Sequence, residues 1–199
     1  MKNTFYYAED HLPTNYAPAM QIDAGNKKIG ALFSVGAAII TFGLMYLFYK
    51  AADFTAFAIN FKGRSLDIIM VASMLVYTYL HEIVHGIVYW AETGIKPTFG
   101  LKLFCAFCGL PKTFVSRRVV LRSVVAPLIF FSCLFVPAIL VTWHYDVCLY
   151  ILFTTLFSVH LGGCIGDIFV TIMLLTKFRD PMTLSNDTGP CQTLYLPVT

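Results

Sequence analysis

The chain has 199 residues, of which 58% are hydrophobic and 13% are charged, and its mean hydropathy is +0.72. A soluble domain of this size is nearer half apolar and a quarter charged, so the composition predicts a membrane protein. The net charge of +3, without any arginine-rich run, argues against a nucleic-acid partner. The length allows one bundle of a few spans, so we expect a single membrane-embedded domain over residues 1–199.

The first 28 residues are polar and include Glu9, Asp10, Pro13 and Pro18. No short apolar core with a small-residue cleavage site follows them, so we expect no cleaved signal peptide. We interpret residues 1–28 as an N-terminal arm and the first hydrophobic run as the membrane anchor.

Four apolar segments follow, each longer than the roughly 20 residues that cross the hydrocarbon core. They cover approximately residues 29–49, 66–91, 119–143 and 148–176. The sequence therefore predicts an all-α polytopic membrane protein with about four transmembrane helices over residues 29–176. We interpret residues 177–199 as a C-terminal tail.

The loop between the first two segments carries an apolar stripe at helical spacing, formed by Phe54, Phe57, Ala58 and Phe61. The stripe favours either a short helix in the membrane interface or a loop packed on the bundle.

Residues 96–116 interrupt the helical pattern. Residues 98–104 and 112–115 partly alternate, and Gly109-Leu110-Pro111 between them is a turn signal. We expect a short β-hairpin or a pair of short strands near the membrane surface. Cys105 and Cys108 form a lone CxxC, which is compatible with a structural zinc but more typical of two reduced thiols.

Basic residues predict the orientation of the bundle. With four spans, the arm, the hairpin region and the tail share one side, which holds most of the lysines and arginines. The other side holds only Lys50, Lys62 and Arg64. We therefore expect a multi-pass protein of the cell membrane whose hairpin and both termini are cytoplasmic.

The second apolar segment contains the motif His81-Glu82-Ile83-Val84-His85. Residues four apart share a helix face, so His81 and His85 can both reach one metal ion. Glu82 then lies beside the ion, where it can take a proton from bound water. The motif predicts zinc-hydrolase chemistry inside a membrane segment.

A catalytic zinc usually has three protein ligands, and Asp167 in the fourth segment is the best candidate for the third. A buried carboxylate is costly there unless it is paired or metal-bound. Asp167 lies ten residues before Lys177, and the histidines lie eleven and seven before Glu92. At about 1.5 Å per residue, all three candidates fall at a similar depth, roughly 10–16 Å from the cytoplasmic helix ends.

Other third ligands are less favourable. Glu92 is seven residues beyond His85 on the same helix, and Ala91 stands where an extended zinc motif has a third histidine. His160 is seven residues before Asp167, so a straight helix cannot bring both to one metal. His160 can instead contact a substrate carbonyl or oxyanion, or simply be a hydrogen-bonded histidine within the membrane.

His81-Glu82-Ile83-Val84-His85-Gly86, the hairpin, Ala126-Pro127 and Gly166-Asp167 together resemble a bacterial family of small membrane zincin peptidases. That family is similar to site-2-protease-type intramembrane metalloproteases. The tail segment Asp187-Thr188-Gly189-Pro190 is also similar, and the resemblance covers most of the chain.

In site-2 proteases the aspartate of the later span is the third zinc ligand, and the resemblance gives Asp167 this role. The chain departs from their asparagine-proline-aspartate-glycine segment, because Ile165-Gly166 precedes Asp167 and Ile168 follows it. His160 also stands where an amide side chain is expected.

The resemblance implies an integral-membrane metallopeptidase with Zn²⁺ as cofactor, Glu82 as general base and a membrane-protein or peptide substrate. The hairpin edge can hold an unwound substrate as an added strand. A non-catalytic zinc-binding scaffold or partner subunit is the alternative, although a closed structural site needs four ligands and no adjacent base. Transport predicts ionisable residues along several spans, whereas here they are confined to two helices at one depth. The oligomeric state stays open.

Overall fold

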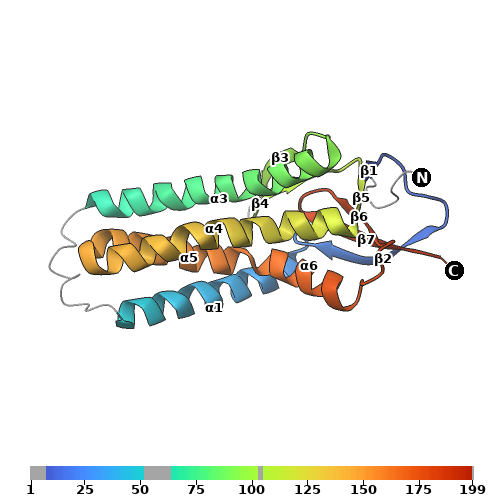
Figure 1. Ribbon diagram of the computed structural model, residues 1–199. Helices are drawn as coiled ribbons and strands as arrows, with labels where there is room; N and C mark the ends of the chain where they lie inside the picture. Colours follow the sequence, from blue (N-terminus) through green and yellow to red (C-terminus); the bar gives the residue numbers. More distant parts are fainter. Residues whose placement is uncertain (1–7, 52–63, 103–104, 199) are drawn as a thin grey trace. The chain divides into compact units, whose positions relative to one another are not determined.

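The computed structural model describes residues 8–51, 64–102 and 105–198, and for residues 64–67, 102 and 105 the backbone alone. The described chain is mostly helical and also contains a β-sheet (Figure 1). The helices are α1 (Lys27–Ala51), α3 (Arg64–Thr93), α4 (Arg117–Tyr145), α5 (Val147–Gly163) and α6 (Ile165–Thr176). The strands are β1 (Ala8–Glu9), β2 (Tyr16–Asp23), β3 (Thr98–Lys102), β4 (Cys105–Gly109), β5 (Phe114–Ser116), β6 (Leu184–Asp187) and β7 (Cys191–Pro197). The apolar stripe expected at residues 54–61 lies outside the described residues.

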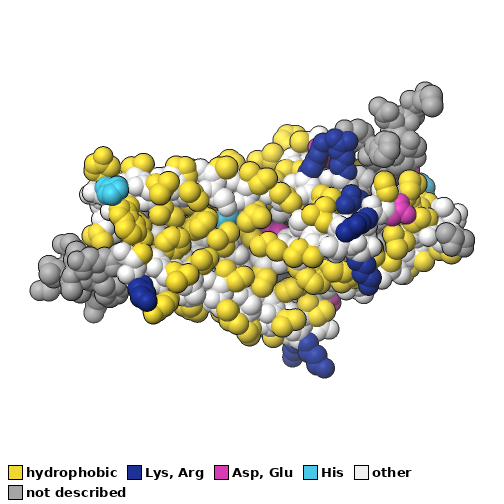
Figure 2. Space-filling view, turned by 60° about the horizontal axis from the view of Figure 1, so that its bottom comes forward, with side chains coloured by type: hydrophobic (Ala, Val, Ile, Leu, Met, Phe, Trp, Pro, Cys, Tyr) yellow, Lys and Arg dark blue, Asp and Glu magenta, His cyan; other side chains and the backbone are white. Residues whose placement is uncertain are grey.

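Among these helices, α1, α3 and α4 are long and apolar enough to cross a membrane, and α5 with α6 counts as a fourth if the pair forms one span. Their bounds lie close to those of the four predicted segments. No residue of α1 is fully buried, and hydrophobic side chains cover much of the visible surface (Figure 2). Such an apolar exterior is what a lipid-facing helix requires.

The fourth predicted segment is two helices, α5 and α6, separated at Cys164. The Cys164 N–H donates to the carbonyl of His160, and the glycines at 162, 163 and 166 weaken the helix around this point. Asp167 therefore lies in the first turn of a new helix rather than in the middle of a long one. The partial positive charge of a helix N-terminus favours a carboxylate at that position.

The N-terminal arm and the tail form strands, which the sequence analysis did not anticipate. They join β5 in an antiparallel five-stranded sheet with the order β1-β5-β6-β7-β2 (Figure 1). The longest pairing runs between β2 and β7, from Tyr16 opposite Pro197 to Asp23 opposite Cys191. The expected all-α class with one hairpin therefore omits the five-stranded sheet, and the described residues are mostly helical with this sheet in addition.

The expected hairpin is present as β3 and β4, which pair from Thr98 opposite Gly109 to Lys102 opposite Cys105. Its reversal does not lie at Gly109-Leu110-Pro111, which instead connects β4 to β5. A Cβ atom on Gly109 would lie 2.4 Å from the backbone nitrogen of Gly189. Gly109 is therefore needed for the close approach of β4 to the tail. The prediction that the hairpin turns at Gly109-Leu110-Pro111 was wrong, because this segment follows β4.

The residues group into two compact units. Unit 1 comprises Met1–Ser34, His81–Pro127 and Gly166–Thr199, and unit 2 comprises Val35–Leu80 and Leu128–Ile165. Unit 1 contains both sheets and the C-terminal turns of α3. Its apolar core includes the fully buried side chains of Val115, Val120, Leu174 and Leu194.

Unit 2 consists of helical segments that approach closely through a small residue. A Cβ atom on Gly162 of α5 would lie 2.2 Å from Thr41 Oγ1 and 2.6 Å from the Ala37 carbonyl oxygen of α1. The Thr41 hydroxyl donates to the Ser158 carbonyl at 3.3 Å. Small residues at such a crossing let two backbones meet, as is common between membrane helices.

Candidate metal centre

The two histidines of the motif lie on one face of α3 in unit 1. His81 Nε2 and His85 Nε2 are 3.2 Å apart, and each residue is 8% exposed. The four-residue spacing stacks the two side chains on successive turns. One helix thereby presents two imidazole nitrogens to the same point.

Asp167 completes the group from the first turn of α6. Its Oδ2 lies 3.2 Å from His81 Nε2 and 3.5 Å from His85 Nε2. The other end of α6 is held by Arg117 of α4, whose guanidinium donates to the carbonyl oxygens of Leu174 and Phe178. A cation on the last carbonyls and a carboxylate in the first turn both suit the helix dipole.

The three donor atoms fit a zinc ion. Ligands about 2.0–2.2 Å from a tetrahedral zinc lie about 3.3–3.6 Å from one another. The separations here are 3.2, 3.2 and 3.5 Å, and all the ligand atoms lie within 4.8 Å. Two imidazoles and one carboxylate leave a fourth position for water, as in catalytic zinc sites. The structure thus brings together the three predicted ligands, and their binding of zinc stays a prediction.

A backbone contact from α4 orients one of the rings. His85 Nδ1 lies 2.9 Å from the carbonyl oxygen of Ser123, which can only accept a hydrogen bond. The proton therefore lies on Nδ1, and the Nε2 lone pair is directed at His81 and Asp167. Metal-binding histidines are commonly fixed by such a second hydrogen bond. The sequence held no signal for Ser123.

Glu82 follows His81 on α3 and faces the hairpin. The backbone N–H of Cys108 in β4 lies near its carboxylate. One residue along a helix turns the side chain by about 100°, so Glu82 lies beside the histidine pair rather than between its two members. This position is compatible with the predicted role of Glu82 as a base, and that role stays a prediction.

A comparison with known families covers this site. A family model described as "Putative zincin peptidase" matches residues 74–181, which is more than half of the 199 residues. The chain belongs to this family. The matched range contains the histidine motif, the hairpin and Asp167, and zincins are metallopeptidases that use zinc. Searches among curated proteins and among solved structures give no match.

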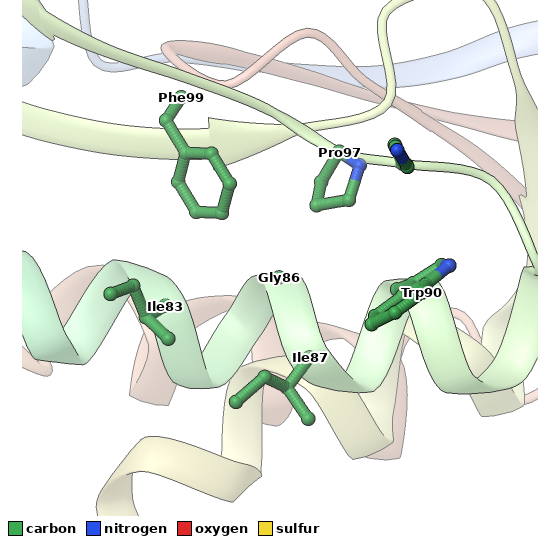
Figure 3. A pocket seen from close by; sticks show the side chains of 7 residues that line it. Ile83, Gly86, Ile87, Trp90, Pro97 and Phe99 are labelled. Carbon is green, nitrogen blue, oxygen red and sulfur yellow. The ribbon is translucent and has the colours of Figure 1, made fainter.

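The hairpin packs on α3 beside the motif. A Cβ atom on Gly86 would lie 2.5 Å from the Phe99 ring and 3.1 Å from Pro97, so a glycine is required at this crossing. Phe99 and Pro97 point toward the helix face that carries Gly86 (Figure 3). The resulting apolar groove has a volume of about 260 Å³ and is also lined by Ile83, Ile87, Trp90 and Lys96.

His160 lies in unit 2 and is fully buried. Its Nδ1 lies 2.8 Å from the Tyr77 hydroxyl, and its Nε2 is 3.4 Å from the Ser132 hydroxyl and from the Leu128 carbonyl. These are contacts of a histidine that is satisfied within packed helices. Its expected contact with substrate stays a prediction.

Of the CxxC pair, Cys108 is a buried free thiol. Burial raises the pKa of this thiol well above its usual value, so it stays protonated and unreactive. The Cys105 side chain lies outside the described residues. Glu92, which the spacing disfavoured as a ligand, pairs with Arg122 instead.

Sequence reasoning missed a second buried contact, between Tyr89 of α3 and Asp187 at the end of β6. The Tyr89 hydroxyl donates to Asp187 Oδ2 at 2.7 Å, and the Tyr89 residue is 1% exposed. Asp187 Oδ1 accepts the N–H of Gly189 at 2.8 Å. The tail segment Asp187-Thr188-Gly189-Pro190 carried part of the family resemblance, but no sequence pattern placed Asp187 against the metal-binding helix.

Asp187 predicts a pH dependence of stability. Burial raises the pKa of its carboxyl to about 6, although the hydrogen bonds from Tyr89 and Gly189 oppose this shift. The folded protein therefore holds this proton more tightly than the unfolded chain does. The resulting stability is fully present below about pH 4 and is lost as the pH rises through about 6.

We expect the melting temperature of the metal-free protein in detergent to fall by about 3 °C or more across this range. Asp187→Asn should remove that part of the pH dependence, because the amide does not titrate. Calorimetric scans at stepwise pH measure the effect. Parallel pH curves for the wild type and the variant would contradict it.

Proposed function

We propose that the protein is an integral-membrane zinc metallopeptidase that hydrolyses peptide bonds within or at the membrane. The observation that carries the proposal is the position of Glu82 beside a three-donor zinc site, on a helix that is long and apolar enough to cross a membrane. A structural zinc site has four closed ligands and no use for an adjacent base. Membership of a zincin peptidase family supports the same chemistry.

Metal binding, proton transfer and ligand orientation are assigned to different residues. His81, His85 and Asp167 would hold a zinc ion, which would supply a Lewis acid that acidifies water and polarises a carbonyl. Glu82 takes the proton from the attacking water and delivers it to the leaving nitrogen. The Cys108 N–H lies near the Glu82 carboxylate that takes the proton, and the Ser123 carbonyl keeps His85 in the tautomer that can bind metal.

The hairpin supplies an edge for an extended substrate. A helical substrate hides its carbonyls in hydrogen bonds, so it must unwind before it is cut. The Cys108 N–H points out of β4 toward Glu82, and alternate N–H groups of a strand share an edge, so that of Ala106 points the same way. No other strand of the described residues pairs with this edge. We propose that substrate adds to β4 here.

Ala106→Pro tests the edge, because it removes the outward N–H and leaves the hydrogen bonds between β3 and β4 intact. One lost hydrogen bond of about 1.4 kcal/mol predicts about tenfold slower cleavage, with unchanged zinc content. Leu101, opposite Ala106 in β3, has its N–H on the other edge. Leu101→Pro is therefore the matched control and should cleave at the wild-type rate. Equal rates for both variants would rule out the β4 edge.

The proposed function is tested with the full chain reconstituted with zinc in lipid vesicles. Two probes are added: single-span peptides with a glycine-rich centre, and casein as a soluble unfolded protein. Mass spectrometry locates the cuts. Cleavage within or next to the spanning segment supports the proposal. Cleavage of casein alone would make the protein a peptidase that does not act on spanning segments, and zinc binding without any cleavage would favour the non-catalytic scaffold.

A further inference from the structure

We propose that Asp187 is a positioning residue for the metal centre, which it reaches through Tyr89 and through the backbone of β4. The inference rests on the proposed function, because it concerns the geometry of the same zinc site. Asp187 lies beyond residues 74–181, the part of the chain that the family model matches.

Asp187 holds three segments together. Its side chain accepts the Tyr89 hydroxyl at 2.7 Å with one oxygen and the Gly189 N–H at 2.8 Å with the other. Its backbone carbonyl accepts the N–H of Leu110 at 2.7 Å. The turn after β6 is thereby bound to α3, to the end of β4 and to itself.

The contact with β4 is direct, backbone against backbone. A Cβ atom on Gly109 would lie 2.4 Å from the Gly189 nitrogen and 2.8 Å from the Asp187 carbonyl oxygen. Gly189 has φ +95°, a conformation that favours glycine. Cys108, whose N–H lies near the Glu82 carboxylate, is the residue before Gly109. The position of the general base therefore depends on how this turn is held.

The contact with α3 acts on the metal ligands. Tyr89 is four residues after His85, so the two side chains lie on the same face of the helix. The Tyr89 hydroxyl also lies close to the Ser123 side chain, and the Ser123 carbonyl fixes the proton on His85 Nδ1. Asp187 thus supports both partners of the hydrogen bond that orients the His85 ring.

Cobalt binding to the full-length, metal-free protein in detergent tests the inference. The variants are Tyr89→Phe, which keeps the buried ring, Asp187→Asn, and the double variant. Controls are Asp180→Asn and Tyr16→Phe, which remove an exposed carboxylate and a hydroxyl that donates to Met182. Cobalt absorption bands report the ligand geometry, zinc competition gives the affinity, and thermal unfolding of the metal-free forms gives the stability.

We expect each single variant to bind zinc about tenfold more weakly than the wild type. This is the lower end of the loss in metal affinity that follows when a hydrogen-bond partner of a metal ligand is replaced. The cobalt absorption bands of the single variants should shift even when the site is saturated with cobalt. The double variant should bind zinc no more weakly than the weaker-binding single variant, because both substitutions remove the same Tyr89–Asp187 contact. Controls should match the wild type. Unchanged bands and affinity in Tyr89→Phe, even with lowered stability, would show a purely structural contact and overturn the inference. A wild-type protein without bound metal would overturn the proposed function as well.

Discussion

Replacing Asp167 by alanine is expected to lower the zinc content of the purified protein from about one ion per chain to nearly none. Asp167 Oδ2 lies within 3.5 Å of both histidine Nε2 atoms, so this substitution removes one of the three proposed ligand atoms. Loss of an outer-shell partner already weakens binding by about 10- to 100-fold, so loss of a ligand should cost at least 100-fold. Elemental analysis of detergent-purified protein measures the result.

The matched control for this experiment is Asp180→Ala, since Asp180 is an exposed carboxylate that bonds only locally to the Met182 N–H in the contacts seen. It should retain the wild-type zinc content. Zinc retained at full stoichiometry in Asp167→Ala would remove Asp167 from the ligand set. Absence of zinc from the wild type, even after reconstitution, would favour a non-catalytic protein.

Replacing Glu82 by glutamine is expected to abolish measurable cleavage while leaving the zinc content unchanged. The amide has nearly the shape of the carboxylate and its oxygen can still face the nearby Cys108 N–H, so the local structure is preserved, but an amide cannot take a proton from water. Loss of a general base slows reactions by about 10²- to 10⁴-fold. Initial rates on the spanning peptides, with the zinc content of the same samples, give the comparison.

Glu92→Gln provides the control on the same helix. Glu92 pairs with Arg122 and has no place in the proposed chemistry, so its variant should cleave at the wild-type rate. Residual activity of Glu82→Gln within a few-fold of the wild type would exclude Glu82 as the base. Loss of zinc from Glu82→Gln would instead make Glu82 part of the metal site.

The two large effects separate the candidate functions. A peptidase loses activity in both variants but loses zinc only in Asp167→Ala. A zinc-binding scaffold would also lose zinc only in Asp167→Ala, but its wild type would have no peptidase activity.

Local patterns predicted much of this architecture. The apolar runs predicted the bounds of α1, α3 and α4 closely, because the length of a membrane-spanning helix follows from a continuous run of apolar residues. The same reasoning missed the sheet formed by the arm and the tail. Pairings such as Tyr16 with Pro197 join distant parts of the chain, and strand formation depends on such partners more than on the pattern of neighbouring residues.

Local sequence patterns predicted the zinc chemistry: the spacing of His81 and His85 predicts two ligands on one helix face, Glu82 lies next to them, and depth along the spans favoured Asp167. The contacts that hold these groups appear only in the folded protein. The break at Cys164 that starts a helix just before Asp167, the Cys108 N–H near Glu82 and the Tyr89–Asp187 contact all depend on packing between segments far apart in the chain. Helical periodicity is a local property, whereas hydrogen bonds that orient a site come from whichever segment the fold brings near.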